Sequence, residues 1–447
     1  MDPISDLKNI YRDAVREVDS AGLMVSRVRK EGRKLVLTGQ GGSWTEDLSL
    51  YRQVMVLGIG KASARMASAM ENILGRELSS GFVITKYGHG LNLQKVKVLE
   101  AGHPVPDENS LKGARILTDM AQAADEHTMI INLISGGGSS LLCLPADGIS
   151  LDHKRKTTQA LLASGAGIDE VNCVRKHLSK VKGGGLARIA SPARLVNLIL
   201  SDVIGDRIDT IASGITAPDP TTFQDALSIV QRYGMDGKLP EAVIDRLARG
   251  ARGDVAETPK TGNPAFRNSI HLVLGNNTLA CTAARASAQK LGYDAQILTT
   301  ALSGEAAEAG KCFAQLAKAI NEGKSRTEKP AIIIAGGETT VTLRGKGKGG
   351  RNQEMALAFA LELHRILQDS ANIFFMSAGT DGSDGPTDAA GALVTPALME
   401  KMKTISAEAA SHLQDNDSYS FFQTQGGLFI TGPTYTNVCD IQVLAVT

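Results

Sequence analysis

A glycine-rich stretch in the first half of the chain has the composition of a phosphate-binding turn. Residues 129–134 are apolar and predict a buried strand, which ends in the SGGGSS turn at residues 135–140. Because glycine lacks a Cβ, the turn can bring backbone N–H groups close to an anion, above all if a helix begins near its end. A plain glycine-rich connection from strand to helix is the alternative. The turn consists of Ser135, Gly136, Gly137, Gly138, Ser139 and Ser140.

A lysine near the start of a helix is the second indication of phosphate chemistry. Residues 51–57 predict a strand, and an alanine-rich helix follows Lys61 to about residue 74. A lysine at a helix N-terminus is unfavourable by about 0.3–1 kcal/mol, whereas a phosphate charge at about 4 Å contributes roughly 4 kcal/mol before desolvation. We therefore expect Lys61 to contact phosphate, and we expect Gly58 and Gly60 of the same loop to bind the cofactor. A lysine extended into solvent is the alternative.

The same loop is a poor match to a dinucleotide-binding fingerprint. Gly58 and Gly60 supply the first two glycines, but Ser63 occupies the third position. The next predicted strand ends in Lys86 and Tyr87 and provides no acid for a ribose hydroxyl. A nicotinamide-dependent activity is therefore the weaker interpretation.

A basic loop at residues 344–351 is the third indication. It holds four basic side chains among four glycines, without the interleaved aromatic residues of a nucleic-acid-binding loop. Arg351 precedes Asn352, which is a candidate N-cap of the next helix, and its guanidinium can hold an oxyanion through two parallel hydrogen bonds. A solvated charged loop is the alternative.

Acidic residues follow several predicted strands and favour magnesium. Oxygen ligands beside a phosphate suit Mg²⁺, which usually takes one or two carboxylates. We expect Asp202, Asp206 and Asp381 to be metal ligands, and Asp202, directly after the predicted strand 194–200, is also a candidate general base. Asp384 is interpreted as a turn residue.

Cations on a predicted helix at residues 169–181 could bind a small carboxylate substrate. Arg175 and Lys182 are seven residues apart and are expected to share a face. A solvated basic face is the alternative. His103, in the loop AGHPVPD, is expected either to line a polar site or to pack.

The elements that must position these residues alternate between strands and helices, which predicts an α/β fold with mostly parallel strands. Predicted strands open into small residues at Gly58, Ser135, Ser201, Gly336 and Ala378. Ligands bind outside the carboxyl ends of such strands. The length of 447 residues suggests two domains, and the polar stretch at 250–269 predicts a boundary there, with a site in the cleft between residues 1–255 and 256–447.

Composition excludes several other classes of function. A formal net charge of +1 leaves no global field to attract nucleic acid or a membrane surface. The five cysteines are scattered and form no C-x-x-C pair, which favours reduced thiols in the cytoplasm. No apolar run approaches the roughly 18 residues of a membrane span, and the charged N-terminus is no signal peptide.

Taken together, the chain resembles the glycerate 2-kinases, or type II glycerate kinases, whose C-terminal part is the MOFRL domain. The resemblance implies a Rossmann-like N-terminal domain and a smaller α/β MOFRL domain. It also implies that ATP and Mg²⁺ are used to phosphorylate the 2-hydroxyl of D-glycerate. Many members were earlier labelled hydroxypyruvate reductases, which is the alternative activity. The matching stretches are GIGKA at 58–62, AGHPVPD at 101–107, SGGGSSL at 135–141, VRKHLSKVKGGGLA at 174–187, LILSDVIGD at 198–206, IASGITAPDP at 211–220, GGETTV at 336–341, GGRNQEMALA at 349–358, GTDGSDGPTDAAGA at 379–392 and TGPTYTNVCDI at 431–441.

The resemblance also implies roles for individual residues. Lys61 matches the lysine proposed to act at the transferred phosphate, and Arg351 matches its proposed partner. Ile215 stands where the family usually has proline, and Gly427 where it often has aspartate, so the first loop is expected to be less rigid and the second lacks an acid. A homodimer is possible. The remaining expectations are nucleotide contacts from Gly337, Glu338 and Thr339, and substrate contacts from His103, Arg175, Lys182 and Asn352.

Overall fold

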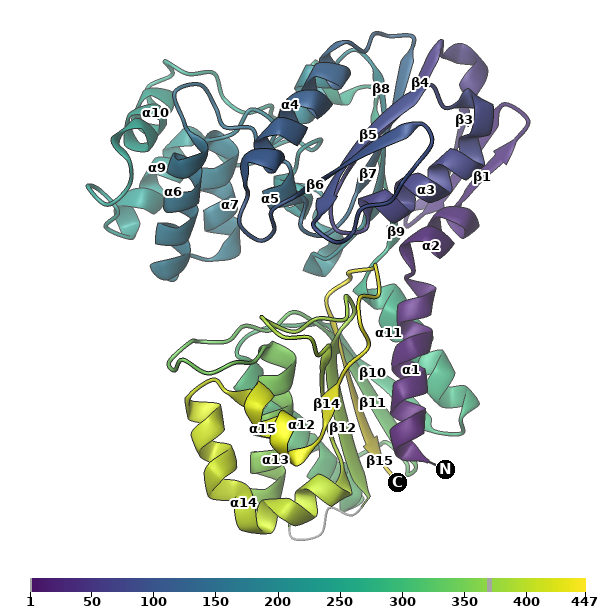
Figure 1. Cartoon of the computed structure of the whole chain (residues 1–447), viewed down its shortest axis with the longest axis vertical. Helices are drawn as coiled ribbons and strands as arrows, with labels where there is room; N and C mark the ends of the chain where they lie inside the picture. Colours follow the sequence, from purple (N-terminus) through teal and green to yellow (C-terminus); the bar gives the residue numbers. More distant parts are fainter. Residues whose placement is uncertain (1, 368–371) are drawn as a thin grey trace. The chain divides into compact units, whose positions relative to one another are not determined.

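The computed structural model describes residues 2–367 and 372–447, which form two compact units (Figure 1). The central unit comprises Leu23–Leu274, and the terminal unit comprises Gly275–Thr447 together with the chain up to Gly22. Each unit is an α/β structure, which confirms the predicted fold class. None of the helices in the described residues is long and apolar enough to cross a membrane.

The central unit begins within α2 and ends within β9. Its strands are β1 (Val28–Glu31), β2 (Lys34–Gly39), β3 (Gly42–Asp47), β4 (Gln53–Ile59), β5 (Ser80–Lys86), β6 (Val96–Ala101), β7 (Thr128–Ile134), β8 (Arg194–Leu200) and β9 (Ser269–Gly275). Its helices are α2 (Ser20–Arg27), α3 (Ser63–Leu74), α4 (Glu108–Gln122), α5 (Gly138–Leu141), α6 (Leu151–Ala163), α7 (Ile168–His177), α8 (Gly185–Ala190), α9 (Phe223–Arg232) and α10 (Glu241–Ala251), beside short 3-10 turns.

The main sheet of the central unit has the strand order β6-β5-β4-β7-β8-β9. The four pairs from β6 to β8 are parallel. From β4 the chain proceeds outward to β5 and β6, and β7 then returns to the other side of β4. The carboxyl ends of β4 and β7 therefore flank a topological switch point, which is where open α/β sheets bind ligands.

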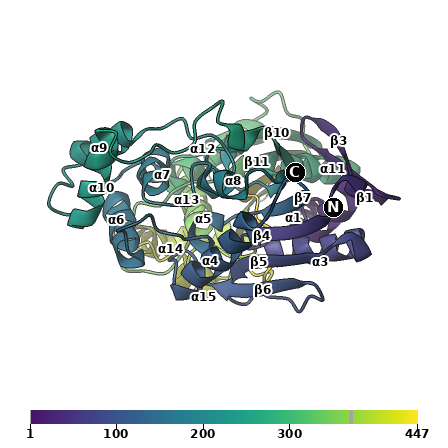
Figure 2. The same ribbon diagram turned by 90° about the horizontal axis from the view of Figure 1, so that it is seen from above.

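Two smaller parts complete the central unit. An antiparallel sheet, β1-β2-β3, lies before the main sheet in the chain, and the backbone N–H of Gln40 in its β2–β3 turn donates to the carbonyl of Val273 in β9. Helices α6, α7, α9 and α10 form a separate group in both views (Figures 1 and 2). Their shared core includes Leu161, Val174 and Phe223, all at most 1% exposed.

The terminal unit has a mixed sheet of order β10-β11-β15-β12-β13-β14. Only β10 and β11 pair in parallel among its described strands, because β15 enters between β11 and β12 in the opposite direction. The expected dominance of parallel strands therefore holds for the first half of the chain and fails in the second. The elements are α1 (Pro3–Glu17), α11 (Asn277–Lys290), β10 (Asp294–Leu302), α12 (Ala306–Asn321), β11 (Ala331–Gly337), α13 (Arg351–Ile366), β12 (Ile373–Gly379), β13 (Gly391–Val394), α14 (Pro396–Gln414), α15 (Ser418–Gln425), β14 (Leu428–Phe429) and β15 (Asp440–Val446).

Helix α1 belongs to the terminal unit although it begins the chain. Its buried face includes Leu7, Ile10 and Ala14 at helical spacing, and it lies beside α11 (Figure 1). Tyr11 Oη donates a 2.7 Å hydrogen bond to the carbonyl of Gly379 at the end of β12. The compact units thus differ from the predicted division at residue 255, because α1 buries its apolar face on the second half of the chain and β9 completes the sheet of the first.

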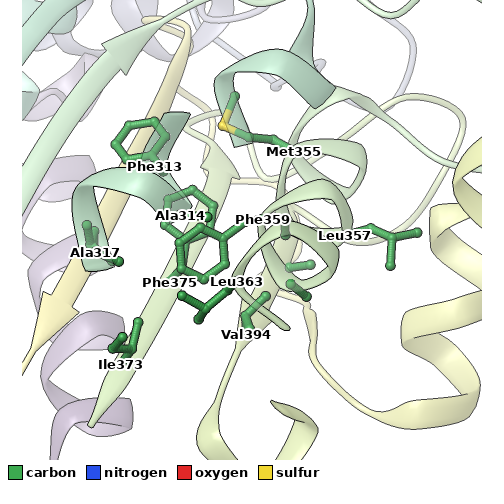
Figure 3. Close-up of a cluster of buried hydrophobic side chains, with 14 of the residues drawn as sticks. Phe313, Ala314, Ala317, Met355, Leu357, Phe359, Leu363, Ile373, Phe375 and Val394 are labelled. Atoms are coloured by element: carbon green, nitrogen blue, oxygen red, sulfur yellow. The ribbon is translucent and has the colours of Figure 1, made fainter. Parts of the chain in front are cut away.

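Phenylalanines form the centre of the terminal unit's core, between α12, α13 and the sheet (Figure 3). The rings of Phe359 and Phe375 stack with centroids 4.4 Å apart, and Phe313 lies 5.1 Å from Phe375. Alternate residues of β11 face this cluster, since Ala331, Ile333 and Ala335 belong to it. The packed sheet fixes the strand ends from which the functional loops extend.

Some element limits depart from the predictions. Strand β8 spans the predicted residues 194–200, but α7 ends at His177 instead of near residue 181. The apolar residues 341–343 also predict a continuation of the strand before them, which is wrong because β11 ends at Gly337. The apolar spacing of residues 4–30 predicts one opening helix, which is wrong from Val28 onward, where β1 begins. Neither β3, α8 nor the elements after β12 were predicted.

Candidate functional site

The loop after β4 and the SGGGSS turn after β7 are hydrogen-bonded to each other. Ser135 N–H donates to Ile59 O at 3.0 Å, Lys61 N–H donates to Gly136 O at 2.9 Å, and Ala62 N–H donates to Ser135 Oγ at 3.1 Å. The two strands are adjacent and parallel, so these contacts continue the ladder past the sheet edge. Lys61 is thereby held at the switch point, two residues before α3 begins at Ser63.

Two glycines in these loops are required by the backbone. Gly60 has φ +121°, and a Cβ there would lie 2.4 Å from the Ser135 carbonyl oxygen. Gly137 has φ +84°, and its Cβ would lie 2.8 Å from His103 Cδ2 and 3.4 Å from Lys61 Cγ. His103 and the Lys61 stem therefore flank Gly137 closely, which brings together three of the predicted site residues.

The SGGGSS turn leaves backbone donors available. Within the described chain, no acceptor is bonded to the N–H groups of Gly136, Gly137 or Ser139, whereas Ser135, Gly138 and Ser140 donate to carbonyls. Adjacent unpaired N–H groups form an anion-binding concavity. This geometry supports the prediction of a phosphate-binding turn over that of a plain connection.

Gly58 contributes to the packing of the sheet. It lies inside β4, buried, and a Cβ there would lie 2.7 Å from Val83 Cγ1 of the neighbouring β5. Its absence of a side chain permits close strand packing, and its predicted contact with a cofactor stays a prediction.

Arg175 and Lys182 both hold the carbonyl of Ser139. Arg175 Nη2 donates to this oxygen at 3.2 Å, and Lys182 Nζ donates to it at 2.8 Å. They do not share a helix face as predicted, because α7 ends at His177 and Lys182 lies in the turn that follows. Both cations therefore help to fix the orientation of the SGGGSS turn through its Ser139 carbonyl. Their contact with a substrate carboxylate stays a prediction.

A chain of polar side chains that no sequence pattern indicated reaches the turn. Ser139 Oγ lies 2.8 Å from Ser213 Oγ, which donates to Asn172 Oδ1 at 3.1 Å. Ala212 and Ser213 adopt φ of +51° and +61°, an unfavourable backbone region for residues other than glycine. Strained backbone is common at functional sites. The stretch IASGI, which the resemblance to the family includes, was the one sequence feature that could have indicated this part of the site.

The acids expected to bind metal come from both units, and their metal contacts stay predictions. No group of three or more His, Cys, Asp or Glu side chains suited to a metal ion occurs in the part of the chain that the structure describes. Asp202 and Asp206 follow β8, beside β7, whereas Asp381 lies in the terminal unit. Asp381 Oδ1 accepts 3.0 Å hydrogen bonds from the N–H and Oγ of Ser383, the pattern of a turn-forming aspartate.

Arg351 is tied to two acids of the terminal unit. Its Nε and Nη2 donate to the two oxygens of Asp440 at 2.5 and 2.9 Å, and its Nη1 lies 2.8 Å from Glu338 Oε1. The two-fold grip predicted for an oxyanion is therefore made with Asp440, which is 1% exposed. Arg351 remains a third exposed, so one face of it is accessible from solvent.

The start of α13 differs from the prediction. Gly350 is the N-cap, and Asn352 lies inside the first turn, so the N-cap assignment for Asn352 was wrong. Asp384 does more than form a turn, since its carboxylate accepts from the N–H groups of Asn352 and Gln353 at 3.1 and 2.9 Å. Asn352 is buried and accepts from Ser377 Oγ at 2.6 Å, which accounts for an amide at this position without a substrate.

The residues after β11 are close to the backbone of β10. Gly337 has φ +149°, and Glu338 N–H donates to Leu302 O at 2.9 Å. Thr339 is buried, and its Oγ1 has no hydrogen-bond partner among the described residues. Nucleotide contacts from Gly337, Glu338 and Thr339 stay predictions.

The two departures from the resembled family lie in ordered backbone. Ile215 is 1% exposed in the core of the central unit, its carbonyl accepts from Leu186 and Ala187, and the expectation of a less rigid loop stays a prediction. Gly427 has φ +115°, and its carbonyl accepts from Leu393 at 2.8 Å. That conformation suits glycine better than an aspartate.

The fold and this site define a class of protein. A parallel sheet with an anion-binding turn and a lysine at its switch point is typical of an α/β protein that handles phosphate groups. Residues 6–248 match the domain of unknown function DUF4147, and residues 331–440 match the MOFRL family. The chain belongs to the glycerate 2-kinase family.

Named relatives extend over nearly the whole chain. A glycerate 2-kinase from Pyrococcus horikoshii is 41% identical over 97% of this chain and 95% of its own. A putative hydroxypyruvate reductase from Agrobacterium vitis is 44% identical over 88% of this chain and 87% of its own. The crystal structure of a glycerate kinase from Thermotoga maritima superposes with a TM-score of 0.83 at 38% identity and covers 100% of both chains.

Proposed function

We propose that this chain is an ATP-dependent D-glycerate 2-kinase, which produces 2-phosphoglycerate and ADP. The observation that carries the proposal is the SGGGSS turn at the switch point of the central sheet, with Lys61 hydrogen-bonded to it and three N–H groups left without an acceptor in the described chain. Relatives that share this architecture are named glycerate kinases.

Phosphoryl transfer requires positioning and charge stabilisation more than covalent chemistry from the protein. The 2-hydroxyl oxygen of glycerate forms a bond to the γ-phosphorus of ATP, the bond from that phosphorus to the bridging oxygen breaks, and ADP leaves. The N–H groups of Gly136, Gly137 and Ser139 would hold phosphate oxygens. The Lys61 ammonium would offset the charge that develops on the transferred group.

The hydroxyl proton requires an acceptor, for which we propose the carboxylate of Asp202, with Asp206 as the alternative. Both follow β8, whose carboxyl end lies beside that of β7. Lys61 lies in the central unit and Arg351 in the terminal unit, so their joint action on one phosphoryl group is a proposal.

The donors present fit a magnesium ion carried by ATP, because Mg²⁺ is commonly bound through one or two carboxylates together with phosphate oxygens. Asp202 and Asp206 are the oxygen ligands that would hold it in the central unit, whereas Asp381 is engaged in a turn. Bound Mg²⁺ would neutralise phosphate charge.

A paired assay tests the proposal. The protein is incubated with D-glycerate and ATP–Mg²⁺, and separately with hydroxypyruvate and NADH or NADPH. We expect ADP and phosphoglycerate in the first reaction and no cofactor oxidation in the second, since the nicotinamide fingerprint is incomplete. Turnover in the second reaction alone would assign the reductase activity that the Agrobacterium vitis relative is named for.

A further inference from the structure

Two buried cations and one half-buried cation line a small pocket of the central unit. Lys154 comes from α6, Arg175 from α7 and Lys182 from the turn after α7, and all three line the pocket. In the described chain none of them forms an ion pair with a carboxylate. Arg175 and Lys182 each donate to the carbonyl of Ser139, so part of their hydrogen-bonding capacity is used.

Lys154 differs from the other two cations because its ammonium has no hydrogen-bond acceptor among the described residues. It is 5% exposed, and within the described residues no acceptor lies within hydrogen-bond distance of its Nζ. Burial above all, together with the cations Arg175 and Arg246, lowers its pKa to about 8 against the opposing effect of Cys143. A buried ammonium without a partner is strongly unfavourable, and a bound anion removes that cost.

The pocket has room for a small ligand only. Its volume is about 160 Å³, whereas pockets for larger ligands measure roughly 300–1,000 Å³. A nucleotide is therefore too large, and a three-carbon hydroxy acid is of suitable size. Pro104, Val105 and Pro106, which follow His103 in the chain, line the pocket, and so does Ser139 of the SGGGSS turn.

We propose that this pocket binds the carboxylate of the acceptor hydroxy acid, with Lys154 as the residue that selects for the carboxylate. The proposal rests on the proposed kinase function and adds a binding residue to it. A carboxylate among Lys154, Arg175 and Lys182 places the rest of the acid toward Ser139, in the turn whose Gly137 is flanked by His103 and Lys61. The triphosphate would then occupy the N–H side of the turn and the carboxylate its carbonyl side.

The test compares Lys154→Met with Lys156→Met, a control on the same helix whose side chain is 64% exposed. In Lys154→Met we expect the KM for D-glycerate to rise about 10- to 100-fold while the KM for ATP changes less than about twofold, because one charged hydrogen bond to the acid is lost. The preference of the wild type for D-glycerate over its uncharged methyl ester should shrink by a similar factor. Lys156→Met should match the wild type.

Two further measurements keep the result decisive. Circular dichroism melting checks folding, and Lys154→Met should melt no lower than the wild type, since it removes an unpaired buried charge. Lys154→Arg should restore part of the affinity. Calorimetric titration of D-glycerate without ATP should show binding to the wild type and at least about tenfold weaker binding to Lys154→Met.

The outcomes separate this inference from the proposed function. A folded Lys154→Met with unchanged KM for D-glycerate and unchanged preference over the ester would overturn the pocket assignment while the kinase stands. A rise in the KM for ATP alone would also overturn it and assign the pocket to phosphate. A wild type that binds D-glycerate in the calorimeter but never phosphorylates it would refute the kinase and retain the pocket.

Discussion

Lys61 is the residue on which the proposed chemistry depends most. Its backbone N–H is fixed by Gly136 and its stem lies against the position of Gly137, so the residue is directed by the turn rather than by α3. A cation held in this way needs little reorganisation as charge develops on a phosphoryl group.

Replacement of this cation gives the first prediction. Lys61→Met is expected to lower kcat by about 10²–10³, with smaller changes in both KM values, because the lost interaction is made mainly in the transition state. Steady-state kinetics with D-glycerate and ATP measures this. Lys97→Met, at an exposed position of β6, is the control. A kcat near that of the wild type would remove Lys61 from the mechanism.

The lowered pKa of Lys154 gives a pH-dependence. Its pKa of about 8 means that the side chain is charged below this pH and neutral above it. If its ammonium binds the acid, the KM for D-glycerate should be flat from about pH 6 to 7.5 and rise by up to tenfold per unit above about pH 8.

The groups that face Lys154 determine how this profile is interpreted. They are Cys143, Arg175, Lys182 and Arg246. Burial also lowers the pKa of Lys182. Lys154→Arg should weaken the rise of the KM with pH, and any rise that is left in this variant is assigned to the titration of Lys182. A KM that stays constant to pH 9.5 in the wild type would contradict a titrating lysine in acid binding.

At the scale of elements, the SGGGSS turn is supported from both sides. The loop after β4 forms hydrogen bonds with the first residues of the turn, while Arg175 and Lys182 donate to the carbonyl of Ser139 near its end. The short helix α5 then begins at Gly138. The turn therefore serves as a scaffold, and its geometry should matter more to activity than to stability.

A pair of glycine substitutions tests this. Gly137 and Gly148 have φ of +84° and +80°, but a Cβ at Gly148 would meet no atom within 4 Å. Both alanine variants should lose about 1–2 kcal/mol of unfolding free energy from the left-handed backbone. Only Gly137→Ala should lose kcat/KM, by about 100-fold, because its Cβ displaces His103 and Lys61. Equal activity losses would argue against the turn as the site.

Element-scale features also show what could be predicted from the sequence. Strand β7 and its turn were predictable because apolar periodicity and glycine act locally. The convergence of Arg175 and Lys182 on Ser139 was not, since α7 ends at His177 and Lys182 lies in the turn that follows. Lys154 gave no signal at all, because burial without a partner is a property of tertiary packing. The partner of Arg351 lies at Asp440, too distant in the chain for spacing to reveal.

At the scale of the whole molecule, the two ends of the chain belong to the same compact unit. Helix α1 is the first element, yet its apolar face is buried in the terminal unit with α11. Loop composition, on which the predicted boundary rests, carries no information on this packing, because the sequence of an amphipathic helix does not indicate its partner.

The division into units predicts where an N-terminal mutation acts. Ile10→Ala should destabilise the terminal unit by about 2–5 kcal/mol, since Ile10 is fully buried. Hydrogen exchange should then accelerate in β12 and β15 and stay unchanged in β4 and β7. Arg12→Ala, exposed on the same helix, should change neither. Faster exchange confined to β4 and β7 would contradict the assignment of α1 to the terminal unit.

The central claim is phosphoryl transfer to the 2-hydroxyl of D-glycerate, and the proton-coupled phosphorus NMR spectrum of the product tests it most directly. A phosphate on carbon 2 couples to one proton and gives a doublet, whereas a phosphate on carbon 3 couples to two and gives a triplet. We predict the doublet, together with the signals of ADP. A triplet would contradict the position of transfer, and a spectrum of unchanged ATP would contradict the kinase.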